Sequence, residues 1–450
     1  MIVAVCAWAG WAGAEAAAAV SAARSARHQL TAVRDRPAGD LLTPGPARAA
    51  RHAARSLDIA ARHARSPALA PVRVLPLVGR QVDSFASLAA ATATATRAAE
   101  AALTSARRLA TSDLPLPQDR PARLDEMHRV ASRARARLRA LDPGPATWLA
   151  PPLAGAHRVF RREAAQLRRD LDRAAATTGS LADLLRGPRT YLLIAANNAE
   201  MRAGSGMFLQ AGSLEFRDGQ MTLHRLAPVW QHLPPPGAVV ATGDMQPGWG
   251  WLSPGDDYRN LALSPRFDRS AEMAAAMWAA AGQGAVDGVL AVDPVALREI
   301  LAAAGPVEIS GETIGAGNVV DDLLLRQYKL DLDWRGQQDR RDRLAAVTTA
   351  TIKRLEAGGT DVRRFVEGLA TAARGRHVLA WAASPDEQQL WRLLGVTGTL
   401  ESRSLLVSVL NRGGGRGGGK LDRRLEASAA MTWRPTGSGT TVTVDLTLHN

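Results

Sequence analysis

The chain has 450 residues and a mass of 47.7 kDa, a length that allows about three domains. Aromatic residues make up 4% and apolar residues 46%, so Ala, Leu and Val carry most of the apolar content. With 22% charged residues, near the average for globular proteins, the composition excludes wholesale disorder and a multi-spanning membrane protein. The single cysteine, Cys6, excludes an intramolecular disulfide framework, a thiolate zinc cluster and an iron–sulfur site.

The formal net charge of +13 raises the question of nucleic acid, because clustered arginines neutralise phosphates. The basic excess is spread through Ala/Arg stretches such as 47–66 and 129–142, which are typical of polar helix faces. Stacking aromatic side chains do not alternate with these arginines. We therefore expect no nucleic acid partner, and favour a solvated basic face or attraction to an anionic membrane or wall polymer.

The N-terminal segment is weakly apolar. Residues 2–14 carry no charge before Glu15, and a full membrane span needs about 20 apolar residues. We expect residues 1–23 to form a partial, single-pass membrane anchor, with the bulk of the chain extracytoplasmic at the cell membrane. The alternative is a soluble Ala-rich helix in which Trp8 and Trp11 are packing residues.

Residues 24–180 are dominated by Ala, Arg and Leu, with Pro/Gly clusters at intervals that end helices. The pattern predicts four or five helices in antiparallel hairpins. Large apolar residues are scarce there, which favours a spacer or an oligomerisation stalk over a catalytic core.

Residues 181–400 are expected to form an α/β core domain. The apolar run 191–196 predicts a strand covered on both faces, and 207–216 with 221–226 predicts a hairpin turning at Asp218-Gly219. A strand over 286–292, a helix capped by Asp293 and a strand over 307–309 together predict a βαβ unit.

Helices are expected at 319–328 and 338–356, and another begins at Ser384 with a capping box to Glu387. The final segment, 401–450, is expected to be β-rich, because apolar and polar residues alternate over 441–448. We interpret it as an incomplete part of a longer β domain.

Three sequence patterns that could indicate a catalytic or metal-binding site do not fulfil the requirements of such a site. The glycine tract 414–420 resembles a phosphate-binding loop, but Leu421 stands where Ser or Thr must hold magnesium, which leaves a flexible loop or a backbone anion nest. Gly204-Ser205-Gly206 lacks the outer glycines of a nucleophile elbow. The nine histidines follow no zinc-binding pattern, so no metal site is predicted.

The segment "YLLIAANNAEMRAGSGMF" stands out, because a buried strand delivers polar residues to the loop at its carboxyl end, where open α/β sheets place ligands. Asn197, Asn198, Glu200, Arg202 and Ser205 are the candidate ligand-binding residues. Amides, a carboxylate and a guanidinium are suited to a sugar or a phosphate. The alternative is that the Asn side chains only tie the loop's own backbone.

This segment, continued by "AGSLEFRDGQMTL", resembles the opening signature of domain-of-unknown-function family 4012, a group of bacterial membrane-anchored, extracytoplasmic proteins of unestablished activity. The resemblance continues through "LPLVGRQ", "YRNLALSPRFDRSAEMAAAMW", "VDGVLAVDPVALREILAAAGPVEI" and "GGGKLDRRL", from about residue 70 to the end.

The core is also similar to LytR-CpsA-Psr enzymes, phosphotransferases that move glycopolymers from a polyprenyl pyrophosphate carrier onto the bacterial wall. That similarity implies a mixed-sheet core in which Arg202, Arg340, Arg341 and Arg343 face a pyrophosphate. The alternative for the last three is an exposed helix start, paired with neighbouring aspartates. The family's Arg-Ser-Asp block is replaced by residues 204–206, and its Pro-Arg-Asp block has no counterpart.

Three functional hypotheses follow. The leading one is an envelope protein of glycopolymer assembly that binds an anionic glycopolymer or a lipid-linked glycan, with no cofactor. The second is an active glycopolymer phosphotransferase, the one alternative that would use magnesium. The third is a non-catalytic scaffold paired with another envelope protein. The missing family blocks leave open whether the protein is an enzyme.

Overall fold

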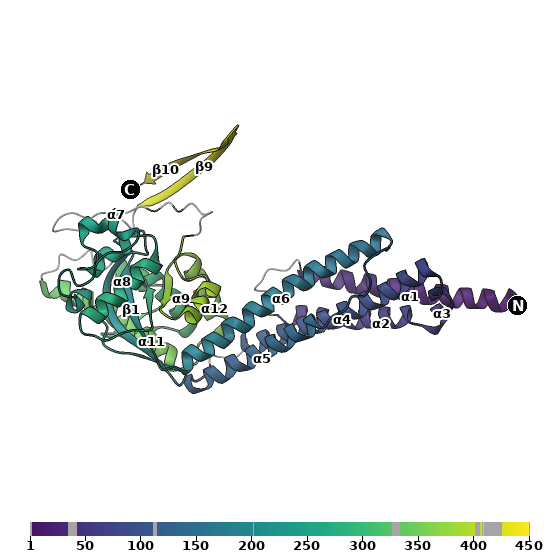
Figure 1. Cartoon of the computed structure of the whole chain (residues 1–450). Helices are drawn as coiled ribbons and strands as arrows, with labels where there is room; N and C mark the ends of the chain where they lie inside the picture. Colours follow the sequence, from purple (N-terminus) through teal and green to yellow (C-terminus); the bar gives the residue numbers. More distant parts are fainter. Residues whose placement is uncertain are drawn as a thin grey trace. The chain divides into compact units, whose positions relative to one another are not determined.

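The computed structural model describes residues 2–34, 43–110, 115–200, 202–325, 334–400, 406, 408 and 425–449. The chain divides into two compact units (Figure 1). The helical unit comprises residues 1–112 and 122–179, and the mixed unit comprises residues 113–121 and 180–450.

The first unit is helical. Its elements are α1 (Ile2–Arg34), α2 (Pro44–Ala64), η2 (Pro67–Leu69), α3 (Ala70–Arg73), α4 (Pro76–Ala110), α5 (Arg120–Arg139) and α6 (Pro151–Arg186). Alanines fill its interior: Ala26 of α1 packs with Ala53 and Leu57 of α2 and Ala93 of α4. Small side chains let these helices approach closely.

The prediction of a membrane-spanning helix at residues 1–23 is wrong. Within the described residues, no helix combines the length and the apolar character that a membrane crossing requires. Residues 2–23 instead belong to the longer α1, in which Ala12, Ala19 and Ala26 recur every seventh residue and are buried against other helices. Glu15 of the same helix lies 2.6 Å from Nδ1 of His63 in α2.

The second unit is built on a six-stranded mixed sheet in the order β3-β2-β1-β5-β8, with β4 also paired to β2. The strands are β1 (Arg189–Asn197), β2 (Met207–Arg217), β3 (Gln220–Leu223), β4 (Ala227–Pro228), β5 (Gly288–Val292) and β8 (Val378–Ala382). β1 and β5 run parallel, whereas β1–β2 and β5–β8 are antiparallel. The helices and mixed sheet agree with the predicted α/β class.

Helices cover the sheet on both faces (Figure 1). They are α7 (Met245–Trp249), α8 (Phe267–Ala280), α9 (Pro294–Ala304), α10 (Val319–Leu324), α11 (Trp334–Glu356), α12 (Val362–Arg374) and α13 (Pro385–Leu394), with short helices η3 (Pro117–Asp119), η4 (Val229–His232), η5 (Gly250–Leu252) and η6 (Tyr258–Leu263). In β1, Leu192 and Ile194 pack in one core cluster with α8, while Tyr191 and Leu193 pack in another with α13. The continuous apolar run of β1 therefore reflects burial on both faces, as predicted.

The predicted hairpin is present. β2 and β3 are joined at Asp218 and Gly219, whose φ angles of 51° and 84° match the positive φ that the turn requires. A side chain at Gly219 would also collide with the backbone oxygen of Pro117, 1.9 Å from its Cβ position. This position therefore requires glycine for two independent reasons.

The predicted βαβ unit is wrong in its last strand. β6 (Val307–Ile309) pairs with β7 (Glu312–Ile314) in a separate two-stranded sheet, and β8 occupies the position beside β5. The turn between β6 and β7 consists of Ser310 and Gly311, both at positive φ. This two-residue turn reverses the chain and pairs β7 with the strand directly before it. A strand of three residues is thereby paired locally.

The predicted capping box at Ser384 is not formed, although α13 does begin at Pro385. The Ser384 side chain makes no capping hydrogen bond. Glu387 instead accepts a hydrogen bond from the hydroxyl of Tyr191 and pairs with Arg189, both on β1. The Glu387 carboxylate is therefore used by contacts with a distant strand and not by the capping box.

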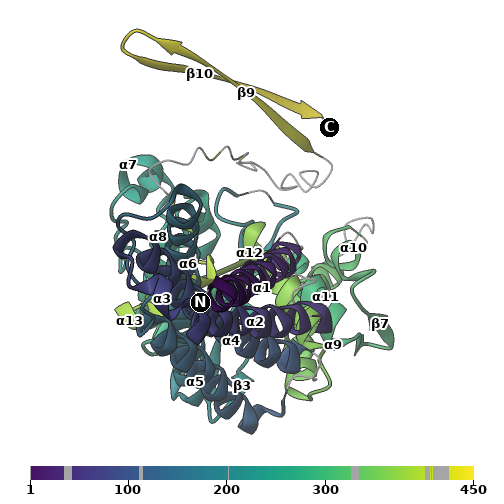
Figure 2. The same ribbon diagram turned by 90° about the vertical axis from the view of Figure 1, so that its right-hand side faces the viewer.

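The C-terminal strands β9 (Glu426–Thr436) and β10 (Gly439–His449) form a separate twisted hairpin (Figures 1 and 2). The strand predicted over 441–448 lies within β10. The glycine tract 414–420 lies outside the described residues, as do residues 326–333 at the end of the helix predicted over 319–328.

Candidate functional site

The carboxyl ends of β1 and β5 lie at one edge of the sheet because the two strands are parallel. Asn197 and Asn198 follow β1 there, and Asp293 follows β5 as the N-cap of α9. His377 directly precedes β8, whose amino end reaches the same edge because β8 is antiparallel to β5. The sheet topology therefore gathers amide, carboxylate and imidazole groups from three separate chain segments.

Asp293 is the centre of this arrangement, and its side chain is completely buried. Its Oδ1 accepts hydrogen bonds from the backbone N–H groups of Val295 and Ala296, at 2.9 and 3.0 Å. Its Oδ2 lies 2.6 Å from Nδ2 of Asn198 and 2.6 Å from Nδ1 of His377. One carboxylate thus caps a helix and holds two side chains of the site.

The contact with Asp293 orients the His377 ring. Because a carboxylate accepts, Nδ1 of His377 donates, and Nε2 is the nitrogen left for a ligand. The side chain is 26% exposed. Gly375 allows this ring position, since a Cβ there would lie 2.7 Å from Nε2 and 2.5 Å from Cδ2.

The loop after β1 is fixed to the turn before β8. Ser205 donates from Oγ to the backbone oxygen of Arg376 at 2.8 Å, and both residues have positive φ, 118° and 59°. Such backbone conformations are costly for side-chain-bearing residues and persist where surrounding structure enforces them. They commonly mark functional sites.

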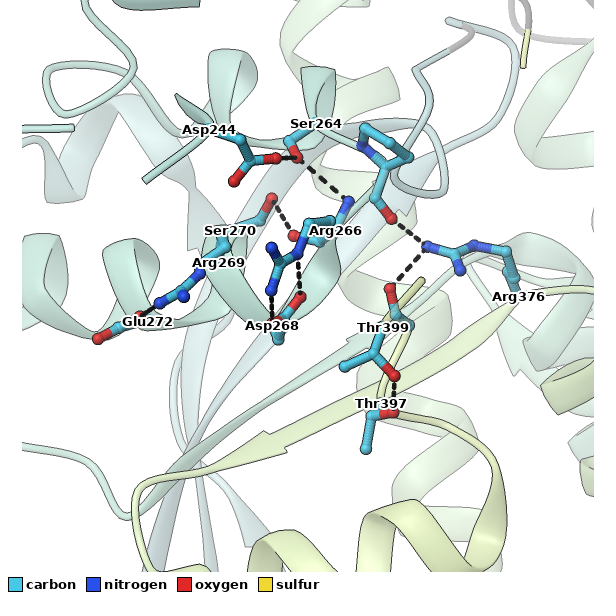
Figure 3. A network of polar contacts seen from close by, with 12 residues as sticks. Asp244, Ser264, Arg266, Asp268, Arg269, Ser270, Glu272, Arg376, Thr397 and Thr399 are labelled. Atoms are coloured by element: carbon cyan, nitrogen blue, oxygen red, sulfur yellow. Dashed lines mark hydrogen bonds and ion pairs between the residues drawn. The ribbon is translucent and has the colours of Figure 1, made fainter. Parts of the chain in front are cut away.

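The Arg376 guanidinium donates to the backbone oxygens of Pro265 and Gly398, beside the ion pair between Arg266 and Asp268 (Figure 3). Burial lowers the pKa of the Arg376 guanidinium, whereas the charge of Asp268 acts in the opposite direction. Arg376 therefore anchors the turn that carries His377.

A pocket lies over this edge of the sheet. The α/β residues that line it include Asn198, Arg202, Ser205, Arg376 and His377, together with Ala203, Gly206 and Gly375. In the part of the chain that the structure describes, no carboxylate lines this pocket, and its ionisable lining groups are all basic. Asp293 lies beneath the lining, in contact with Asn198 and His377.

The other candidates after β1 have different surroundings. Asn197 is buried, and its Oδ1 accepts a hydrogen bond from the backbone N–H of Ala199 at 2.9 Å, as the loop-tying alternative predicts. Glu200 contributes its backbone oxygen to Met207, and its charge raises the pKa of Arg259, an effect secondary to that of Asp257. Neither residue lines the pocket.

The arginines expected at the start of α11 are not brought to the pocket by any described contact. Arg343 forms ion pairs with Asp322 of α10 and Glu312 of β7, which raise the pKa of its guanidinium. This arrangement matches the alternative of a helix start held by acidic neighbours, although the partners differ from those expected. The side chains of Arg340 and Arg341 lie outside the described residues.

Four aspartates between residues 244 and 268 contact other groups of the protein. Asp257 pairs with Arg259, Asp268 pairs with Arg266, and Asp256 accepts from the backbone N–H of Gly237. Asp244 accepts from the Ser264 hydroxyl at 3.4 Å (Figure 3). Within the described ranges, no three His, Cys, Asp or Glu side chains are grouped as a metal site would require.

Two residues of the site were missed by the sequence analysis. Asp293 was interpreted only as a helix cap, and His377 was not singled out. The available signal was weak: a histidine directly before the apolar strand "VLAWA", and an aspartate directly after the apolar strand "GVLAV". The sequence does not reveal that β5 and β8 are antiparallel neighbours, which is what brings the two residues together.

Comparison with known proteins identifies one domain. Residues 186–328 match the family described as "Protein of unknown function (DUF4012)", which confirms the predicted family over a shorter stretch than the expected one from about residue 70 to the end. The chain therefore contains a DUF4012 domain, and the match includes Asn198, Arg202, Ser205 and Asp293 of the pocket region. No curated protein and no solved structure matches the chain. The similarity to LytR-CpsA-Psr enzymes is not supported by any match.

Proposed function

We propose that the mixed unit, which contains the DUF4012 segment, binds phosphate groups of an anionic glycopolymer or a lipid-linked glycan, in extracytoplasmic assembly of the cell envelope. The supporting observation is the pocket at the carboxyl ends of β1 and β5. It is lined by Arg202, Arg376 and His377 with no acidic lining residue among those described. The geometry favours an anionic ligand over a cationic one, because an anion entering this pocket meets basic side chains.

The side chains that line the pocket would contact the ligand in different ways. Arg202 supplies a guanidinium whose planar fork matches phosphate oxygens. His377 offers Nε2, and it donates from there when the ring is protonated. Asn198 is fixed by its hydrogen bond to Asp293, so its remaining groups are held in place at the pocket wall. A relationship of this core to the LytR-CpsA-Psr fold is part of the proposal and rests on the sequence blocks alone.

Calorimetric titration of the full chain tests the binding proposal. The probes are inorganic pyrophosphate and a polyprenyl pyrophosphate, each with and without Mg²⁺. We expect Arg202→Ala to weaken pyrophosphate binding at least tenfold. Arg392→Ala, an exposed arginine of α13 outside the pocket, is the matched control and should bind as the parent does.

Two results would count against the binding proposal. One is an absence of binding by the parent, which would leave the scaffold hypothesis ahead. The other is an equal loss of binding in Arg202→Ala and Arg392→Ala, which would indicate general charge attraction. Arg340→Ala adds a separate arm, because a loss there would support the pyrophosphate role implied by the family resemblance.

A phosphotransferase is the second candidate, favoured by the contact between Asp293 and His377. A buried carboxylate that holds Nδ1 of a histidine leaves Nε2 as an acid–base group. In such a transfer, an acceptor hydroxyl gives its proton to Nε2 while its oxygen bonds to phosphorus. The bond from phosphorus to the leaving phosphate then breaks with its electron pair.

Measurements of turnover distinguish the binding hypothesis from the transferase hypothesis. Under the transferase hypothesis, His377→Gln loses turnover of a polyprenyl pyrophosphate glycan by about 100-fold or more, while ligand affinity falls much less. Under the binding hypothesis, the parent shows no turnover with any hydroxyl acceptor, with or without Mg²⁺. Release of the free polyprenyl phosphate, the leaving group of this transfer, is the measured quantity.

A further inference from the structure

The helical unit contains a long open groove with a volume of about 1470 Å³. Its walls are formed by α1, α4 and α6, with a smaller contribution from α2. Along α4 the lining runs from Gln81 to Leu103, a distance of about 33 Å at 1.5 Å per helical residue. The groove lies entirely within one of the two units.

The groove surface is mainly apolar. Val20 of α1, Phe85 of α4, and Val159 and Phe160 of α6 all line it. Val20 is 41% exposed and Val159 is 47% exposed, so both present apolar surface to whatever fills the groove. The smaller lining residues are largely alanines, which leave space between the helices. A continuous apolar lining of this length is unusual for a solvent-filled surface.

Four arginines flank this apolar surface. Arg24 and Arg27 come from α1, and Arg158 and Arg162 come from α6 on the other wall. All four are exposed. The positively charged groups thus stand at the rim, and the apolar groups line the interior.

Packing contacts relate one arginine of each wall to a position along α4. Ala23, next to Arg24, packs in the cluster that contains Ala89 of α4. On the other wall, His157, next to Arg158, contacts the hydroxyl of Ser84 at 2.7 Å. Arg24 therefore lies near the middle of the length that the groove follows along α4, and Arg158 lies closer to its Gln81 end.

Few carboxylates lie close enough to pair with these arginines. Within the described part of the chain, no carboxylate pairs with Arg24, Arg27 or Arg158, and the acidic lining residue is Glu163, 3.7 Å from Arg162. Because these like charges are exposed, water and salt screen their mutual repulsion and leave it weak. An anion between the walls would complement the arginines.

We propose that this groove binds a long-chain lipid with a phosphate headgroup. The hydrocarbon chain lies along the apolar surface of α1, α4 and α6, and the phosphate lies between the arginines of the two walls. Guanidinium groups bind phosphate oxygens through paired hydrogen bonds, and burial of each methylene contributes about 0.8 kcal/mol. This groove is a different site from the pocket at the carboxyl ends of β1 and β5. The proposal does not depend on the function proposed for that pocket.

The length and charge of the groove select this occupant. A compact sugar or nucleotide would leave most of the apolar lining uncovered. A helix from a second copy would match the length, but it would bring an apolar stripe against the four arginines unless it also carried acidic residues. A chain with a single anionic end satisfies both features at once.

Equilibrium binding of radiolabelled hexadecyl phosphate to the full chain tests the proposal. The same measurement on Arg202→Ala, which removes a guanidinium from the pocket at the carboxyl ends of β1 and β5 but not from the groove, should give the same affinity as the parent. Unlabelled dodecyl maltoside, a neutral amphiphile, is the competitor that tests the role of the headgroup. We expect saturable binding that the neutral amphiphile displaces only weakly.

Two kinds of variant separate the charge from the apolar surface. The double variant Arg24→Glu/Arg158→Glu should bind hexadecyl phosphate at least tenfold more weakly, and Val20→Glu/Val159→Glu should do the same. All four positions are exposed, so the fold should tolerate the changes, which circular dichroism checks. Arg169→Glu, an exposed arginine of α6 outside the groove, is the matched control and should bind normally.

Three results would overturn the proposal. The first is the absence of saturable hexadecyl phosphate binding. The second is equal binding by the parent and both double variants. The third is a parent dimer in sedimentation that the groove substitutions dissociate without any effect on lipid, which would assign the groove to a second copy of the chain.

Discussion

The carboxylate of Asp293 lies 2.6 Å from Nδ1 of His377, although the two residues are 84 positions apart in the chain. Asp293 is fully buried, while His377 is partly exposed at the pocket. The same carboxylate caps α9 through two backbone N–H groups. The first helical turn of α9 and the ring orientation of His377 are therefore fixed by one side chain.

Two substitutions of Asp293 should distinguish its role as the cap of α9 from its role in orienting the His377 ring. Asp293→Asn keeps an oxygen that can cap α9, because Asn is as good an N-cap as Asp. Asp293→Ala removes the cap and leaves Asn198 and His377 without their partner. We expect Asp293→Ala to lower the free energy of unfolding by about 2–4 kcal/mol, the sum of a lost cap and unsatisfied buried groups, and Asp293→Asn by clearly less.

Urea unfolding followed by circular dichroism measures both Asp293 variants. In addition, the ¹⁵N chemical shifts of the His377 ring report which nitrogen carries the proton. Asp293→Asn should change that tautomer even though the fold is kept. An unchanged tautomer would contradict the role of Asp293 in orienting the ring.

Gly206 should be intolerant of substitution for two reasons. Its φ is 89°, and a Cβ there would lie 2.6 Å from the backbone oxygen of Asn197. Gly284 has the same φ of 89° but no atom within 4 Å of its Cβ position. Gly284→Ala should therefore lose about 1–2 kcal/mol for backbone conformation alone, and Gly206→Ala several kcal/mol more through the collision.

Thermal unfolding of the two glycine variants tests this difference. Equal melting temperatures would show that the loop after β1 relaxes around the added methyl group. In that event the geometry of the pocket edge would be less fixed than the contacts of Ser205 and Asn197 indicate.

Tyr191 joins β1 to α13 in the core. Its hydroxyl donates to Glu387 at 2.6 Å and accepts from the indole N–H of Trp391 at 3.2 Å. Tyr191→Phe removes the partner of the Trp391 indole N–H and of Oε2 of Glu387, whose Oε1 still pairs with Arg189, and we expect a loss of about 1–3 kcal/mol in the free energy of unfolding. Tyr258→Phe is the matched control, because its buried hydroxyl makes one long contact of 3.5 Å and should lose less.

Tyr191 also predicts a dependence on alkaline pH. Burial, followed by the hydrogen bond to Glu387, raises the pKa of its phenol above the ordinary value of 10.0. The unfolded chain thus releases this proton at a lower pH than the folded chain. The associated stability is present below pH 10 and is lost as the pH rises above it, a loss that should be absent in Tyr191→Phe when urea unfolding is compared across this range.

His157 predicts a dependence on acid pH in the helical unit. Burial, and secondarily the charge of Arg161, lower the pKa of His157 from its ordinary value of 6.5. Between the two pKa values the unfolded chain binds a proton that the folded chain does not. Its contribution to stability is therefore complete above pH 6.5 and is lost as the pH falls, by at most about 1.4 kcal/mol per pH unit.

The His157 effect is measured as a difference between variants. Urea unfolding of the parent and of His157→Gln should be compared from pH 7.5 to about pH 5. We expect the parent to lose more stability than the variant over this range. Parallel curves would show that His157 is protonated equally in the folded and unfolded chains.

Elements with local signals were predicted well. The strand 191–196, the hairpin turn at Asp218-Gly219 and the Asp293 cap all appear in the structure. Each depends on residues close together in sequence: an apolar run, two residues suited to positive φ, or a side chain that reaches the next helical turn. Such features need no knowledge of the remainder of the chain.

The wrong predictions share one physical cause. Glu387 satisfies the pattern of a capping box, but Tyr191 and Arg189 of a distant strand use its carboxylate instead. Residues 2–14 lack charge, but their helix continues to Arg34 and its alanines pack against α2 and α4. In both cases a tertiary contact competes with the local pattern, and the sequence does not contain the partner's position.

The sequence by itself determined the α/β class, the DUF4012 segment and the loop that carries Asn198, Arg202 and Ser205, because these depend on local periodicity and on motif order. Tertiary structure alone decided the site's central contact between Asp293 and His377. Those residues meet because β8 lies antiparallel beside β5, and strand order is set by the burial of both sheet faces under helices. Burial of whole faces is a property of the assembled chain, which no local pattern encodes.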